Sequence, residues 1–223
     1  MKDSLFFELI QVAIGKLDCL SRGAEPEEWL LFHDMAIQQR IEGVCYQGVQ
    51  RLFEFGLRAP QDLSIDWMAE VEALREKNEQ NTKKAPVVRY YPENLRDLRQ
   101  YQKDRLLNVT RVTIKELYQL YLRRHLDLRT LMDYYFTLQQ TQGKYETLKG
   151  GGILSCMGIR RFARGVMWML QETLGIEQDA MPFVPSEKEG RFLLNDVMQK
   201  ASKIDHWKHV LFIYPLGIMG LRA

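Results

Sequence analysis

The sequence predicts a mainly α-helical protein with an N-terminal helical bundle and a C-terminal helical subdomain. Apolar residues recur at spacings of three and four along most of the chain, which is the pattern of amphipathic helices. Glycine and proline lie near the ends of these segments, where they start or stop helices. Apolar residues make up 46% of the 223 residues and charged residues 27%, so a sizeable core can form.

The N-terminal bundle is expected from four helical segments joined by short connections. Pro26 suits the first turn of the second segment, and the glutamates around it favour the positive end of a helix. Gly56 is expected to end the third segment, and the fourth runs on into a polar stretch. The expected ranges are 3–18, 26–40, 42–55 and a helix starting near 64.

The C-terminal subdomain is expected to start with a charged helix over 94–105. Residues 114–140 follow as one long helix or as two abutting helices, and both alternatives fit the apolar spacing. A helix over 159–174 stops at Gly175, and another runs from about 186 to 200. A last apolar segment lies around Trp207.

The polar stretch between the subdomains, residues 78–95, breaks the helical pattern. The predicted organisation is therefore an N-terminal subdomain over 1–77, a seam over 78–95 and a C-terminal subdomain over 96–223. Any sheet is minor and limited to one strand near 87–91, where the apolar run "VVRYY" stands.

Composition restricts the partners and the compartment. The net charge of +2 argues against a dedicated nucleic-acid-binding surface. The three cysteines are widely spaced and odd in number, as expected for free thiols in a reducing compartment. The N-terminus lacks the unbroken apolar run of a signal peptide, and no window approaches a membrane span, so we expect a cytoplasmic protein without a membrane partner.

Arginines provide the best functional signal that the residues themselves give. Arg123, Arg124 and Arg129 are close in sequence, and the stretch "GIRRFAR" adds Arg161 with two more. If these two stretches lie on neighbouring helices, their guanidinium groups can bind phosphate oxygens, and these four arginines are the candidate phosphate-binding residues. The plainer interpretation is a solvated helix face whose arginines pair with Asp127 and neighbouring acids.

Other motifs give no catalytic residue and no metal ligand. The glycine-rich stretch "LKGGGILSCMG" lacks the pattern of a phosphate-binding loop and is interpreted as a helix end and turn. His206 and His209 are spaced to share a helix face, but a metal site needs a third ligand, so they are interpreted as surface or interface histidines. The aspartates never form a D-x-D pair.

The order of several segments resembles a family of uncharacterised bacterial nucleotidyltransferases of the polymerase-β-type superfamily. The N-terminal match is "WLLFHDMAIQQRIEGVCYQGVQRL". The C-terminal match runs from "LYLRRHLDLRTLMDYYFTL" through "LKGGGILSCMGIRRFARGVMWMLQETLGI" and "PSEKEGRFLLNDVMQ" to "FIYPL". The resemblance implies transfer of a nucleoside monophosphate from a nucleoside triphosphate to an acceptor, a protein or a small molecule, with Mg²⁺.

The chain departs from that family at the decisive place. Its members carry a small α/β core with a glycine turn, a D-x-D and a third acid, and here the interval 78–95 is too short to hold this core. No catalytic residue of the family can be placed on this chain. We therefore expect the helical framework of a nucleotidyltransferase-like protein that lacks the catalytic core, and the alternatives are a non-catalytic helical binding module or a purely structural helical protein.

Overall fold

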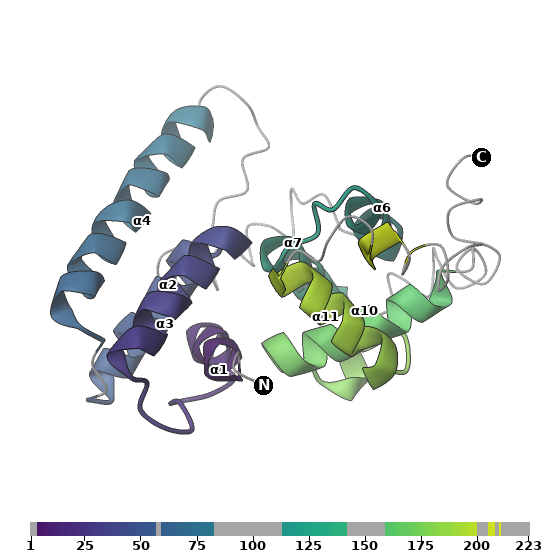
Figure 1. The fold of residues 1–223 in the computed structure, drawn as a ribbon, viewed down its shortest axis with the longest axis horizontal. Helices are drawn as coiled ribbons and strands as arrows, with labels where there is room; N and C mark the ends of the chain where they lie inside the picture. The colour runs from purple at the N-terminus through teal and green to yellow at the C-terminus, as the bar shows by residue number, and fades with distance from the viewer. Residues whose placement is uncertain are drawn as a thin grey trace. The chain divides into compact units, whose positions relative to one another are not determined.

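The computed structural model describes residues 4–56, 59–82, 113–141, 159–199, 205–207 and 210. Its described part is helical throughout, with turns between the helices and no strand, which confirms the mainly α-helical fold class (Figure 1). The expected strand near 87–91, the charged helix over 94–105 and the glycine-rich turn lie outside the described residues. The chain divides into two compact units, Met1–Asn108 and Val109–Ala223.

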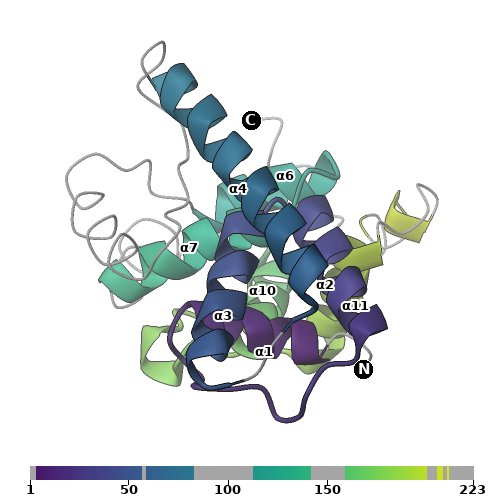
Figure 2. The same ribbon diagram turned by 90° about the vertical axis from the view of Figure 1, so that its left-hand side faces the viewer.

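The first unit contains the helices α1 (Ser4–Ala13), α2 (Pro26–Gln39), α3 (Glu42–Glu54) and α4 (Gln61–Thr82). The helix α3 packs against each of the other three. The longest of these four, α4, crosses in front of the other three in Figure 2, and its C-terminal end extends beyond them. The apolar faces of α1, α2 and α3 supply most of the buried side chains of this unit, as the helical spacing predicts.

Helix ends in this unit follow local signals. Pro26 occupies the first turn of α2, and Glu25 and Glu28 form a reciprocal capping box at its start. Arg40 ends α2 in the left-handed conformation with φ 56°. The first helix ends at Ala13, five residues earlier than expected, where Gly15 turns the chain with φ 80°.

Close contact between α1 and α3 depends on Gly48. A Cβ atom at this position would lie 2.6 Å from the backbone oxygen of Leu9 and 2.8 Å from its Cδ1 atom. Real Cβ atoms do not approach other atoms so closely, so only glycine allows the two helices this separation. The guanidinium of Arg51 also donates a hydrogen bond to the backbone oxygen of Val12, which ties the same two helices together.

The second unit contains α6 (Ile114–Leu122), α7 (Leu128–Thr141), α10 (Arg160–Leu174), the 3-10 turn η1 (Gln178–Ala180) and α11 (Glu187–Gln199). The expected segment 114–140 is thus two helices. Gly175 ends α10 in the left-handed conformation with φ 61°, as predicted from sequence.

Among the described helices of this unit, α10 and α11 share the most extensive contact, and a glycine on each helix permits it. A Cβ atom on Gly165 would lie 2.6 Å from Leu193 Cδ1, and a Cβ atom on Gly190 would overlap the indole of Trp168. The buried face of α10 includes Phe162, as the helical spacing predicts. The core of the second unit therefore forms on a pair of helices that approach each other through glycines.

Candidate functional site

The turn between α6 and α7 forms one side of the candidate site. Arg123 ends α6, and Arg124 follows with φ 59°, in the left-handed region that non-glycine residues seldom adopt. The amide of His125 donates to the backbone oxygen of Leu120 at 2.8 Å, which closes the last turn of the helix. This turn separates two helices whose apolar spacing is continuous.

Asp127 begins the second of these helices. Its Oδ1 accepts hydrogen bonds from the backbone amide and the hydroxyl of Thr130, at 2.9 and 2.7 Å. These are the contacts of an N-cap residue, which satisfies helix donors that have no backbone partner. The stretch 123–127 is therefore held by a helix end on one side and a helix start on the other.

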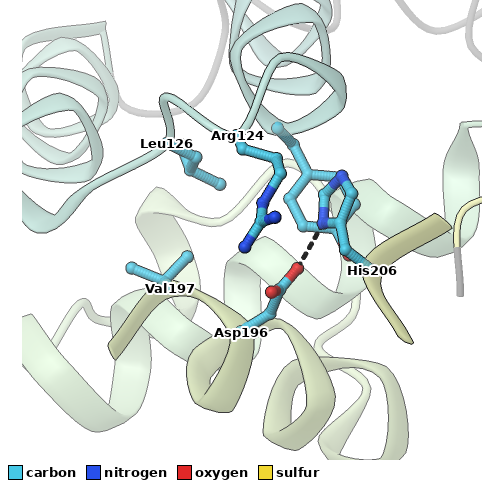
Figure 3. A pocket seen from close by; sticks show the side chains of 6 residues that line it. Arg124, Leu126, Asp196, Val197 and His206 are labelled. Atoms are coloured by element: carbon cyan, nitrogen blue, oxygen red, sulfur yellow. Dashed lines mark hydrogen bonds and ion pairs between the residues drawn. The ribbon is translucent and has the colours of Figure 1, made fainter. Parts of the chain in front are cut away.

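Asp196 and His206 form a buried polar pair next to this turn. The Nδ1 atom of His206 lies 2.6 Å from Oδ2 of Asp196, and the side chains are 1% and 5% exposed. The Tyr121 hydroxyl also hydrogen-bonds this carboxylate, and the Tyr121 and His206 rings lie 4.7 Å apart. Figure 3 shows the guanidinium of Arg124 extending toward the same carboxylate. These four residues, from α6, the following turn, α11 and residues 205–207, are called the Asp196 cluster below.

The carboxylate of Asp196 is stabilised in its charged form. Burial alone raises the pKa of this carboxyl, because a charged group is poorly solvated in the interior. The hydrogen bond and the charge of His206, the hydroxyl of Tyr121 and the charge of Arg124 act in the opposite direction and hold the pKa below its usual value. The cluster is therefore built around a buried carboxylate anion.

A small cavity of about 30 Å³ lies within the cluster, with Leu126 and Val197 as its apolar walls. A space of this size holds a water molecule but no nucleotide. With Asp196 ionised, Nδ1 of His206 donates the hydrogen bond to the carboxylate, and the second ring nitrogen is Nε2. Among the described residues, this buried Nε2 has no hydrogen-bond partner. Because His206 is almost fully buried, the cluster fits the role of positioning the turn and residues 205–207 rather than contacting a substrate.

The four predicted arginines have different surroundings. Arg123 and Arg161 are exposed, Arg129 is half-buried on α7, and Arg124 is half-buried beside Asp196. The rings of Tyr118 and Tyr121 lie 5.0 and 5.4 Å from the ring of Phe162, in the first turn of α10. This contact places the end of α6 beside the start of α10, so the two arginine-bearing stretches are neighbours.

Sequence reasoning missed the Asp196 cluster. The expectation that His206 lies at a surface was wrong, because Asp196 and Tyr121 provide the polar contacts that make its burial possible. His209 lies outside the described residues. Asp196 and His206 are ten residues apart, and no motif in the sequence links them.

The described part of the chain holds no cluster of metal-binding side chains. The family resemblance implies an ion held by several carboxylates, whereas within the described ranges no group of three His, Cys, Asp or Glu side chains converges on one point. In the same part of the chain, no helix combines the length and the apolar character needed to cross a bilayer.

Comparisons with protein-family models, with curated proteins and with solved structures gave no match.

Proposed function

We propose that this chain is the helical framework of a nucleotidyltransferase-like protein, and that its second unit binds the phosphates of a nucleotide through Arg123 and Arg161. The reaction of the whole protein would transfer a nucleoside monophosphate from a nucleoside triphosphate to an acceptor. The family resemblance is the basis for the proposed reaction, and one contact in the structure supports the proposed position of the phosphate-binding site.

That contact is the packing of Tyr121 against Phe162, at a ring separation of 5.4 Å. It supports the proposal because it brings together the two stretches that carry exposed arginines. Guanidinium groups from two neighbouring elements can bind a phosphate from two directions, with paired hydrogen bonds. The Asp196 cluster helps to hold the end of α6, and so fixes the position of Arg123.

The N-terminus of α10 adds an electrostatic field that favours phosphate binding. Its N-cap residue is Ile159, and its first turn contains two arginines and no acid. A helix N-terminus carries a partial positive charge, which attracts phosphate. An acidic residue in this turn would weaken the attraction.

Nucleotide binding by the whole chain tests the proposal. Fluorescence polarisation with labelled ATP and Mg²⁺ gives the dissociation constant of the parent protein and of Arg123→Ala/Arg161→Ala. We expect the double variant to bind at least about tenfold more weakly, since hydrogen bonds to charged groups contribute about 1.5–3 kcal/mol each. Arg191→Ala is the matched control, because Arg191 is an exposed arginine on α11 that pairs with Glu187.

Equal binding by the parent and the double variant would contradict the proposal that Arg123 and Arg161 form the binding site. If the parent bound no nucleoside triphosphate, the proposal that the chain binds a nucleotide would be wrong. Pyrophosphate release then separates two functions. Release with an acceptor present supports transfer by this chain. Binding without release favours the alternative, a non-catalytic helical binding module.

A further inference from the structure

The first unit carries a groove that the proposed function does not use. It lies between the first halves of α1 and α2, and Ser21 and Arg22 from the connection between them line it as well. Its volume is about 500 Å³, within the range of sites that bind small molecules or a few side chains of a partner. Its lining includes Glu8 and Leu5 of α1 and Glu27, Leu31 and Phe32 of α2.

The charged groups of the groove are three glutamates and one arginine. The arginine is already engaged, because the two terminal nitrogens of Arg22 donate to the two carboxylate oxygens of Glu28 at 2.7 and 2.6 Å. The hydrogen bond from Arg22, helped by the backbone amide of Glu25, lowers the pKa of Glu28 to about 2. The positive charge among the lining residues is therefore balanced by one of the glutamates.

The other two glutamates of the groove are Glu8 and Glu27. Glu8 accepts hydrogen bonds from the backbone amide and the hydroxyl of Ser21, at 2.7 and 3.0 Å. These donors are neutral, so they orient the carboxylate without neutralising it. Glu27 is exposed in the first turn of α2. The groove therefore presents two carboxylates on opposite walls, one on each helix.

Apolar side chains complete the lining. Leu5 and Phe32 are buried in the wall, and Leu31 is 44% exposed, one turn of α2 away from Glu27. The neighbouring Leu30 is 56% exposed and extends the apolar surface beyond the groove. A ligand that matches this lining needs an apolar body next to positive charge. A polyamine has the charge without the apolar side chains, whereas lysine and leucine together have both.

We propose that this groove binds a short basic, amphipathic segment of a partner protein, with its apolar side chains against Leu31 and its lysines or arginines beside Glu8 and Glu27. Charge complementarity selects this occupant. The whole chain carries a net charge of +2, so a basic segment is drawn to the groove by its local charge rather than by the overall charge of the protein.

The test uses a short fluorescein-labelled peptide of alternating lysine and leucine, titrated with the full chain and followed by fluorescence polarisation. Two further peptides replace lysine by glutamate or leucine by serine. We expect the lysine–leucine peptide to bind at least about tenfold more tightly than either of them, because one control peptide lacks the positive charges and the other lacks the apolar side chains. Equal binding of the three peptides would overturn the proposal.

Variants locate the binding. Glu8→Gln/Glu27→Gln keeps the shape of both side chains. In Glu8→Gln the amide oxygen can accept from the backbone amide of Ser21 while the new NH2 group donates to the Ser21 hydroxyl oxygen, so the fold is retained. We expect at least about a tenfold loss of affinity for the lysine–leucine peptide. Glu27→Lys, at an exposed position, gives a second variant with a larger expected loss. Glu72→Gln/Glu76→Gln is the matched control, because these glutamates are exposed on α4 and do not line the groove.

The salt dependence provides an independent readout. The affinity of the parent for the lysine–leucine peptide should fall as ionic strength rises, and the double variant Glu8→Gln/Glu27→Gln should show a weaker dependence. Affinities of this double variant and of Glu27→Lys equal to that of the parent would place the peptide elsewhere and overturn the assignment. A loss of the same size in the α4 control would also overturn it.

Discussion

His206 donates to Asp196 across 2.6 Å in the interior of the second unit, and this pair attaches residues 205–207 to α11. Each group makes the burial of the other possible. A buried carboxylate without a partner is strongly unfavourable, and so is a buried imidazole that lacks its acceptor. The pair therefore contributes to the stability of this unit in a way that an exposed ion pair does not.

Asp196→Asn removes the charge and leaves the shape. We expect the free energy of unfolding to fall by about 3 kcal/mol, as is typical when one partner of a buried pair is lost. Chemical denaturation gives this value. Glu187→Gln is the control, because it breaks the exposed pair with Arg191 and should cost less than about 1 kcal/mol. Similar losses for the two variants would contradict the distinction between the buried and the exposed pair.

Acid should weaken the parent protein through the same carboxylate. The pKa of Asp196 is lower in the folded state than its usual value, so its stabilising contribution is complete above about pH 4 and is lost as the pH falls through the folded-state pKa. We expect Asp196→Asn to lack this part of the pH dependence. Melting temperatures of both proteins between neutral and acid pH measure the difference, and parallel curves would refute it.

Two glycines of α3 should respond in opposite directions to alanine. Gly48→Ala places a Cβ atom against Leu9 and should lower the free energy of unfolding by about 1–3 kcal/mol. Gly43→Ala meets only Val71 Cγ1 at 3.8 Å, an ordinary contact, and should raise stability by roughly 0.5 kcal/mol through helix propensity. Thermal unfolding of the two variants gives the sign of each effect. A destabilised Gly43→Ala would show that the contact with α4 is tighter than described.

The cysteines of the first unit should differ in reactivity. Burial raises the pKa of the Cys45 thiol, and its side chain is inaccessible, whereas Cys19 is exposed. We expect iodoacetamide to label Cys19 in the native protein and Cys45 only after unfolding, since the thiolate is the reactive form. Peptide mass spectrometry after a short exposure distinguishes the two sites. Rapid native labelling of Cys45 would contradict the packing of α3.

The sequence contained enough information for the helices and for some of their ends. Apolar spacing is a local property, and so are the effects of Pro26 and Gly175, so these features were predictable. The apolar spacing does not decide whether the chain breaks between α6 and α7, because Arg124 adopts a left-handed conformation that the residue type does not favour. Only the contacts made by the folded chain hold it there.

The candidate site was less predictable. The arginines of both stretches were visible as charges, but their proximity depends on Tyr121 meeting Phe162 across forty-one positions of sequence. The pairing of Asp196 with His206 likewise belongs to tertiary structure, and a histidine near charged neighbours gives the same sequence pattern whether it is buried or exposed. Local sequence patterns predict the secondary structure, whereas the contacts between polar groups far apart in sequence depend on tertiary packing.

The glycines at the contact of α10 and α11 also determine which alignment of these helices is allowed. Gly190 faces the indole of Trp168, where only a hydrogen atom fits. Sliding α11 by one turn, about 5.4 Å, would bring Leu193 or Leu194 to this position. The leucine would then overlap the indole, so alternative registers are excluded by volume rather than by the loss of any single bond. This pair of helices thus has one permitted alignment. That alignment fixes the position of every residue on α11 relative to α10, including Asp196.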